Sequence, residues 1–192
     1  MTVQNVMSIC LLAFLVIMLQ VRAAILRKRG IRVIVFGQTD KSDFLLVPLV
    51  LAIVYAALSN TFGLPFWDVL IRPFWEAEAL GWLGLSICAV SVTGFALTIA
   101  SFGDSLRVGI DENTSDKLVT KGMFAISRNP IYVCFLMFFT GFFLIHCNIV
   151  IAVAIVLFSL AIHRQILREE KFLISHYGEE YEEYRKKVRR YL

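Results

Sequence analysis

Ionisable side chains gather where the last long apolar stretch of the sequence, residues 149–162, comes to an end. His163 and Arg164 follow it directly, and Glu169 and Glu170 come one to two helical turns later. A helix over 149–162 would be roughly 21 Å long, which is short of the roughly 30 Å hydrocarbon core of a bilayer. Either the bilayer is thinner there, or His163 and Arg164 lie at membrane depth, where ionisable groups persist if they face a polar cavity. A salt-bridged helix end, with long side chains reaching the interface, is the alternative interpretation.

A second group of candidate functional residues begins at Arg128 and Asn129, which directly precede Pro130; Tyr132 follows two residues later. Proline suits the first turn of a helix, because its missing N–H would have no helical partner there. Arg128 and Asn129 would then lie beside unpaired backbone N–H groups and the positive end of the helix dipole, which suits an anionic group. The same residues also fit a simple helix cap with basic and aromatic interfacial anchors.

The composition indicates the kind of element that must position these residues. Apolar residues make up 58% of the 192 residues and charged residues only 18%, and the mean hydropathy is +0.73. Soluble domains carry about a quarter charged residues. Membrane-spanning helices need about 20 apolar residues, and the candidate stretches are Val6–Ile25, Phe44–Phe62, Leu80–Phe102 and Ile131–Ile162.

The last of these stretches is too long for one crossing and carries Asn148 near its middle. We interpret it as a helical hairpin, so the sequence predicts an all-α integral membrane protein with about five transmembrane helices. Every lysine and arginine except Arg72 then falls on one side if the N-terminus lies outside. This distribution follows the positive-inside rule and places the C-terminus and both reactive groups in the cytoplasm. The compact size favours a prokaryotic cell membrane over the endoplasmic reticulum.

The chain is expected to form a single membrane domain, 1–192, with a three-helix part over 1–102 and a cofactor-binding and catalytic part over 103–192. Apolar residues within the loop Gly103–Asn129 argue that this loop is ordered, and long loops are usually functional or disordered. The tail Gln165–Leu192 is predicted to form a helix, a break near Gly178, and a second, charged helix. The four cysteines do not have the spacing of metal ligands. The net charge of +4 indicates cytoplasmic loops that contact anionic lipid rather than a nucleic-acid-binding surface.

The segment from Leu118 to Tyr191 resembles the isoprenylcysteine carboxyl methyltransferases and the related phospholipid methyltransferases. The resemblance is carried, in order, by Leu118-Val119-Thr120-Lys121-Gly122-Met123-Phe124, Arg128-Asn129-Pro130-Ile131-Tyr132, Gly141, Glu169-Glu170, Leu173, Tyr177-Gly178-Glu179-Glu180-Tyr181, Tyr184 and Arg190-Tyr191. This family uses S-adenosyl-L-methionine without a Rossmann domain, and the sequence contains no G-x-G-x-x-G turn.

The resemblance implies which residues bind the cofactor. Carried over by position, they are Lys117, Leu118, Val119, Phe124, Arg128, Asn129, Pro130, Ile131, Tyr132, Glu169 and Glu170. The sequence departs from the family at two of these positions, because the family often has histidine in place of Asn129 and tyrosine in place of Phe124. Asparagine can still donate a hydrogen bond, whereas phenylalanine can only stack.

The implied reaction is methyl transfer to the C-terminal carboxylate of an isoprenylated cysteine or a similar lipophilic carboxylate, which enters sideways from the bilayer. A carboxylate is already ionised at pH 7, so neither a general base nor a metal is needed. Arg164 is expected to orient the acceptor carboxylate, and Glu169 or Glu170 to hold the ammonium group of the cofactor. The residues with catalytic roles are thus predicted to be Arg164, Glu169 and Glu170.

Two other functions remain open at the level of sequence. A phospholipid or other lipid-amine N-methyltransferase would share the cofactor motif but would need a base, such as His163 or Glu170. A non-enzymatic membrane subunit or transporter would belong to another class. A transporter would be expected to show repeats or helices broken at mid-membrane, and the sequence shows neither.

Overall fold

A computed structural model describes residues 2–29, 46–103 and 118–192, and the regular structure within these ranges is entirely helical. The helices are α1 (Val3–Lys28), α2 (Leu46–Phe62), α3 (Asp68–Ile71), α4 (Glu78–Phe102), the 3-10 helix η3 (Gly122–Ala125), α5 (Pro130–Ile145), α6 (Ile149–Tyr177) and α7 (Glu179–Lys187). The predicted all-α fold class is therefore confirmed for the described part of the chain. Lys117 and most of the predicted cofactor loop lie outside it.

Three of these helices, α1, α4 and α6, are long and apolar enough to cross a bilayer. Two more, α2 and α5, are equally apolar in character but have only 17 and 16 residues. Large apolar side chains on the outer surfaces are exposed, for example Leu51, Val90 and Leu160, each about 60% accessible. Because such a surface is stable only against hydrocarbon, the chain is a helical membrane protein. The number of crossings stays a prediction.

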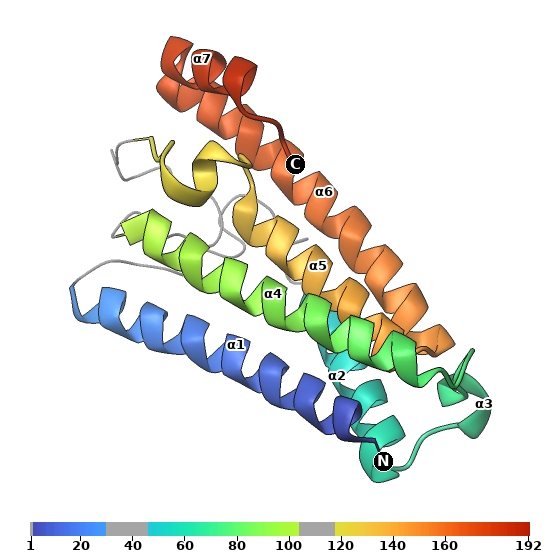
Figure 1. Ribbon diagram of the computed structural model, residues 1–192. Helices are drawn as coiled ribbons and strands as arrows, with labels where there is room; N and C mark the ends of the chain where they lie inside the picture. The colour runs from blue at the N-terminus through green and yellow to red at the C-terminus, as the bar shows by residue number, and fades with distance from the viewer. Residues whose placement is uncertain (1, 30–45, 104–117) are drawn as a thin grey trace.

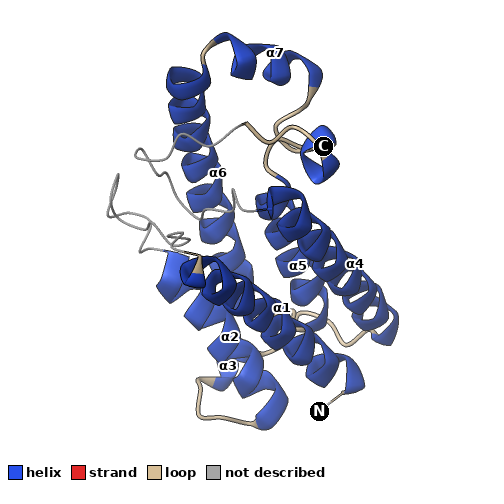
Figure 2. Cartoon of the chain, turned by 90° about the vertical axis from the view of Figure 1, so that its left-hand side faces the viewer, coloured by secondary structure: helices blue, strands red, loops and turns tan. Residues whose placement is uncertain are grey.

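The long helices run alternately up and down, so the N-terminus and α7 lie at opposite ends of the molecule (Figure 1). α4 packs most extensively against α5, whereas α6 packs mainly against α2. The C-terminal part of α6 extends beyond the start of α5, and α7 with the residues after it returns toward that start (Figure 2). The end of the molecule that carries α7 is called the α7 end below.

The contact between α4 and α5 is close because a glycine from each helix lies at the crossing. A Cβ atom built on Gly84 would lie 2.5 Å from the carbonyl oxygen of Gly141, and one built on Gly141 would lie 2.6 Å from that of Gly84. Backbone atoms cannot move aside as a flexible side chain can, so neither position accepts a larger residue without separating the helices.

Replacing Gly141 with alanine is therefore expected to lower the thermal unfolding midpoint of the protein in detergent, since overpacking costs about 1–3 kcal/mol. Gly81→Ala in the same helix as Gly84 is the matched control, because its nearest contact would be the flexible Gln4 side chain at 3.4 Å. That variant should unfold at the wild-type temperature or slightly above it, since alanine favours a helix. Equal midpoints for Gly141→Ala and wild type would contradict the packing argument.

The predicted hairpin is present, and its turn is short. α5 ends at Ile145 and α6 begins at Ile149, with the Asn148 side chain accepting a hydrogen bond from the Ile151 N–H at 3.0 Å. The predicted break in the tail is also present at Gly178, whose φ of +54° is a left-handed conformation that favours glycine. Both interruptions of the helical pattern were thus correctly placed from sequence.

Candidate functional site

The start of α5 and the polar part of α6 meet at the α7 end. The Tyr132 hydroxyl donates a hydrogen bond of 2.6 Å to Glu169 Oε1. The Gln165 amide, one turn earlier on α6, donates to the same oxygen at 3.1 Å. The cofactor site predicted from the sequence needs Tyr132 and the glutamate pair close enough to contact one small molecule. The structure places Tyr132 in direct contact with Glu169, the neighbour of Glu170.

Glu170 lies between two arginines that come from distant parts of the chain. Its side chain is only 5% exposed, and its Oε1 lies 3.1 Å from Arg128 Nη2. Its Oε2 accepts hydrogen bonds from Arg190 Nε at 3.1 Å and Nη2 at 2.8 Å. These bonds stabilise the charged guanidinium and raise the pKa of Arg190. A buried carboxylate needs such partners, because an isolated charge would lose its hydration without compensation.

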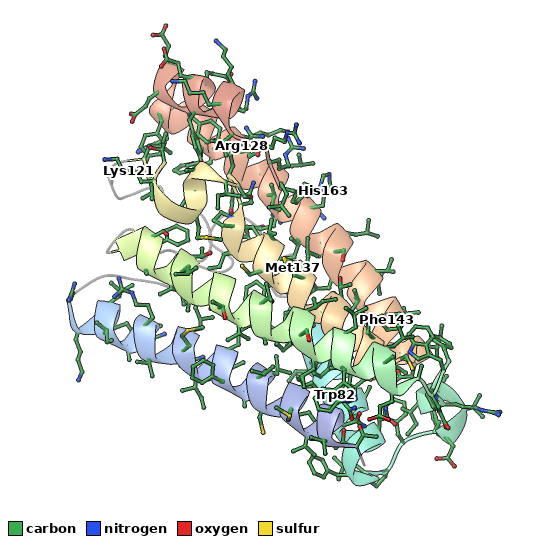
Figure 3. All side chains as sticks on the ribbon, in the orientation of Figure 1. Trp82, Lys121, Arg128, Met137, Phe143 and His163 are labelled. Carbon is green, nitrogen blue, oxygen red and sulfur yellow. The ribbon has the colours of Figure 1, made fainter. Side chains whose placement is uncertain are left out.

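The last residues of the chain, Val188–Leu192, run across the start of α5 and are called the C-terminal strap. The Arg128 N–H donates to the Arg189 carbonyl at 3.0 Å. The Arg190 carbonyl accepts from the Ser127 hydroxyl at 3.2 Å and from the Asn129 amide at 3.1 Å. The strap therefore joins α5 through its backbone and α6 through the Arg190 side chain. In Figure 3 the Arg128 side chain lies where these segments meet.

The strap also reaches the residues at the end of the apolar part of α6. The Tyr191 hydroxyl lies 2.6 Å from His163 Nδ1, and the two rings are stacked with their centroids 6.2 Å apart. Burial raises the pKa of Tyr191, so the phenol stays protonated near neutral pH. His163 and the strap are thus directly linked beside Arg164, which is exposed on α6.

Tyr184 of α7 holds the segment before α5 in place, and Tyr181 packs against Tyr184 with ring centroids 6.0 Å apart. The Tyr184 hydroxyl donates to the Phe124 carbonyl at 2.6 Å, and the Phe124 ring packs edge-on against Phe102 at 4.6 Å. Tyr181 is 1% exposed, and burial together with the neighbouring charge of Glu170 raises its pKa to about 12. Order in the described part of the predicted loop, residues 118–129, is therefore imposed by α4 and α7.

Five of the eleven residues carried over from the resemblance take part in the polar contacts above: Arg128, Asn129, Tyr132, Glu169 and Glu170. Phe124 is held through its carbonyl by Tyr184. Pro130 is the buried first residue of α5 and Ile131 packs against the core. Leu118 and Val119 are half-buried in a segment without regular secondary structure, with no contact to the glutamates among those described, and Lys117 lies outside the described residues. The cofactor-binding and catalytic roles of all these residues stay predictions.

The sequence analysis assigned no role to Ser127, Arg190 or Tyr191. Arg190 contributes both a carbonyl and a guanidinium to the cluster, and each contacts a residue that was predicted to bind the cofactor. The available signal was the resemblance itself, because Tyr184, Arg190 and Tyr191 are part of the ordered series that carries it. Their distance along the chain from Arg128 gave no indication that the strap folds back onto α5.

Comparison with known proteins identifies the family to which this chain is similar. The family model for phospholipid methyltransferases matches residues 79–180. A Schizosaccharomyces pombe protein named protein-S-isoprenylcysteine O-methyltransferase is 34% identical over 118 residues, which are 59% of this chain and 48% of that protein. The human protein of the same name is 31% identical over 122 residues, or 60% of this chain and 43% of that protein.

A third relative, from Oryza sativa subsp. indica, is named "Probable protein-S-isoprenylcysteine O-methyltransferase" and is 32% identical over 146 residues, which are 72% of each chain. The chain thus spans less than half the length of the fission-yeast and human relatives and nearly three quarters of the rice protein. The family model covers more than half of the chain and includes α4, α5, α6 and the glutamate pair. The chain therefore belongs to the phospholipid methyltransferase family and, within it, groups with relatives named protein-S-isoprenylcysteine O-methyltransferase.

Proposed function

We propose that this protein transfers the methyl group of S-adenosyl-L-methionine to the C-terminal carboxylate of an isoprenylated cysteine, or of a similar lipophilic carboxylate, at the inner membrane interface. The observation that carries the proposal is the partly buried polar cluster in which Tyr132, Glu169, Glu170, Arg128 and Arg190 converge at one end of an apolar bundle. Family membership supports the type of reaction, and the names of the relatives support the acceptor.

The membrane placement follows from the same geometry. We infer that α1, α2, α4, α5 and α6 each cross the bilayer, with the N-terminus outside and α7 in the cytoplasm. The alternating directions of these helices (Figure 1) and the basic residues at the α7 end support this orientation. Trp82 and Phe143 lie at the opposite end (Figure 3), where aromatic side chains suit the outer interface.

The side chains of this site match the chemical groups of the cofactor. S-adenosyl-L-methionine carries an ammonium group, a carboxylate, a ribose and an adenine, and when bound it supplies the sulfonium methyl group. Glu169 or Glu170 would hold the ammonium group, and Asn129 and Tyr132 offer an amide and a phenol for polar contacts. Leu118, Val119 and Phe124 would form apolar surroundings.

The chain's own contribution to catalysis is orientation and exclusion of water. An ionised carboxylate is already nucleophilic, so the enzyme has to hold it in line with the methyl group; correct positioning is worth about 7–11 kcal/mol in favourable cases. Arg164, exposed where the apolar part of α6 ends, would hold the acceptor carboxylate by charge-assisted hydrogen bonds. The lipid tail of the acceptor would stay among the apolar helices, which avoids the cost of exposing it to water.

The names of the relatives favour a carboxylate over an amine acceptor. The charges of the cluster are balanced and favour neither acceptor, because Arg128 and Arg190 carry two positive charges and Glu169 and Glu170 carry two negative charges. Amine methylation is the second candidate, because the matching family model is that of phospholipid methyltransferases.

The decisive test supplies purified protein in detergent with S-adenosyl-L-methionine labelled in its methyl group. An S-farnesylcysteine derivative with a free carboxylate and phosphatidylethanolamine are the two acceptors. A methyl ester releases labelled methanol in base, whereas an N-methyl group does not. We expect base-labile product from the prenylcysteine alone; base-stable product from the phospholipid would instead support the second candidate. Failure to bind S-adenosyl-L-homocysteine by isothermal titration would support a non-enzymatic membrane subunit or transporter.

A further inference from the structure

The turn between α5 and α6 holds a histidine that the proposed reaction does not use. His146 directly follows α5, its side chain is fully buried, and it lies at the end of the molecule opposite α7 (Figure 1). Its Nε2 lies 2.9 Å from the Ser8 hydroxyl oxygen of α1, and its ring packs against Phe142 with the centroids 4.5 Å apart. The contact with Ser8 links the hairpin to the first helix.

The same contact fixes which ring nitrogen of His146 carries the proton. A serine hydroxyl has a single proton to donate, and that of Ser8 goes to the Asn5 carbonyl at 2.8 Å, because a carbonyl can only accept. Ser8 Oγ must therefore accept a hydrogen bond from His146 Nε2–H. Burial lowers the pKa of His146 to about 4, so the ring is neutral near pH 7 and its Nδ1 is an acceptor.

His146 Nδ1 and Asn148 have complementary unmet hydrogen bonds. Nδ1 is buried and has no donor among the described residues. Asn148 is also fully buried, and its Oδ1 accepts from the Ile151 N–H, which fixes the orientation of the amide. Its Nδ2 is then a buried donor without a partner in the described part of the chain. Buried polar groups are almost always paired, so the turn needs a ligand that can both donate and accept.

The surroundings of this pair favour an uncharged ligand. The His146 ring lies against a hydroxyl and a phenyl ring, and the adjacent Cys147 thiol donates to the Trp75 carbonyl at 3.1 Å. Within the described ranges, no group of three or more histidine, cysteine or acidic side chains could hold a metal ion. Burying an ion without a countercharge is costly, whereas a water molecule can donate and accept and suits a buried site with several polar partners.

We propose that the α5–α6 turn binds buried water, with His146 Nδ1 accepting a hydrogen bond from it and Asn148 Nδ2 donating one to it. Together with Ser8, this water completes a polar anchor that holds the α5–α6 hairpin to α1. The inference is independent of the proposed function, because the turn is separated from the α7 end by the whole length of α5.

Solid-state NMR of the protein in lipid bilayers, with its histidine nitrogens isotopically labelled, tests the site directly. The chain has three histidines; His163→Gln and His176→Gln, both at exposed positions, identify two signals, so the third belongs to His146. We expect the His146 proton on Nε2 and transfer of magnetisation from water protons to Nδ1. A proton on Nδ1, or transfer to Nδ1 from the Asn148 amide alone, would overturn the proposal.

Two serine variants test the tautomer on which the site depends. Ser8→Ala removes the acceptor of Nε2–H, so less of His146 should carry its proton on Nε2. The unfolding midpoint should fall by about 2–4 °C or more, as for a lost buried hydrogen bond. Ser86→Ala is the matched control and should change neither value, because the exposed Ser86 hydroxyl donates within its own helix to the Trp82 carbonyl. An unchanged tautomer in Ser8→Ala would overturn the assignment of Nδ1 as an acceptor and, with it, the water site.

Discussion

Glu170→Gln is expected to lower the affinity for S-adenosyl-L-homocysteine by about 100-fold or more while the apolar helices stay folded in detergent. The neutral amide offers one acceptor oxygen in place of the two that Arg128 and Arg190 now use. Breaking a buried ion pair from one side costs about 3–5 kcal/mol, because the remaining charge is left uncompensated. Here two guanidinium groups would face each other without a carboxylate between them.

The loss should be local to the α7 end. Glu170 is not part of the apolar core in which the long helices pack, so the helical circular dichroism should be close to that of wild type. The strap should detach, and trypsin should then cleave it faster at its arginines. Isothermal titration measures the affinity, and wild-type affinity in Glu170→Gln would exclude this carboxylate from the site.

Two further variants show whether the effect is specific. Glu183→Gln makes the same chemical change at an exposed position of α7 and should leave binding unchanged. Adding Arg190→Gln to Glu170→Gln removes one of the two uncompensated charges, so the double variant should lose less than the two single losses together. Simple additivity of the two changes would mean that Arg190 and Glu170 act independently.

Arg164→Ala is expected to lower kcat/KM for a prenylcysteine acceptor by about 10-fold to 100-fold, with little change in cofactor affinity. A charge-assisted hydrogen bond to a carboxylate contributes about 1.5–3 kcal/mol, which corresponds to this range. Arg164 follows His163 at the boundary between the apolar and polar parts of α6. An acceptor whose tail stays in hydrocarbon would present its carboxylate at that depth.

The readout for Arg164 is the contrast between two measurements on the same variant, initial rates at varied acceptor and titration with S-adenosyl-L-homocysteine. Lys171→Ala, two turns further along α6 and exposed, removes a positive charge outside the proposed acceptor path and serves as the control. Arg164→Lys should recover only part of the rate, because lysine cannot form the paired hydrogen bonds of a guanidinium. Equal losses in acceptor turnover and cofactor affinity would contradict the assignment to the acceptor.

The helical architecture could be predicted because it depends on local patterns. Long apolar stretches need a helix in a membrane, since every backbone polar group must be satisfied within its own segment. The hairpin turn at Asn148, the start of α5 at Pro130 and the break at Gly178 follow from residues that cap, begin or end helices whatever the rest of the chain does. Each of these positions agrees with the structure.

Part of the site could be predicted as well. Gln165 and Glu169 are one helical turn apart, so their hydrogen bond follows from helix geometry alone. The proximity of Tyr132 to the glutamate pair was expected from the resemblance rather than from any local rule. It is a tertiary contact, and the structure was needed to give its partner and distance.

Local patterns in the sequence were enough to predict the long helices and the polar residues that border them, although not the short helices α3 and η3. The return of the strap to α5, the sharing of Glu170 by Arg128 and Arg190, and the close approach of Gly84 and Gly141 are tertiary contacts that no local pattern indicates. The physical reason is range: helix propensity, capping and hydrophobicity act within a few residues, whereas these contacts join residues 20 to 61 positions apart. Many polar residues could in principle pair with Glu170. Packing and burial select Arg128 and Arg190, because the buried carboxylate has to be compensated by the cations that lie next to it in the folded chain.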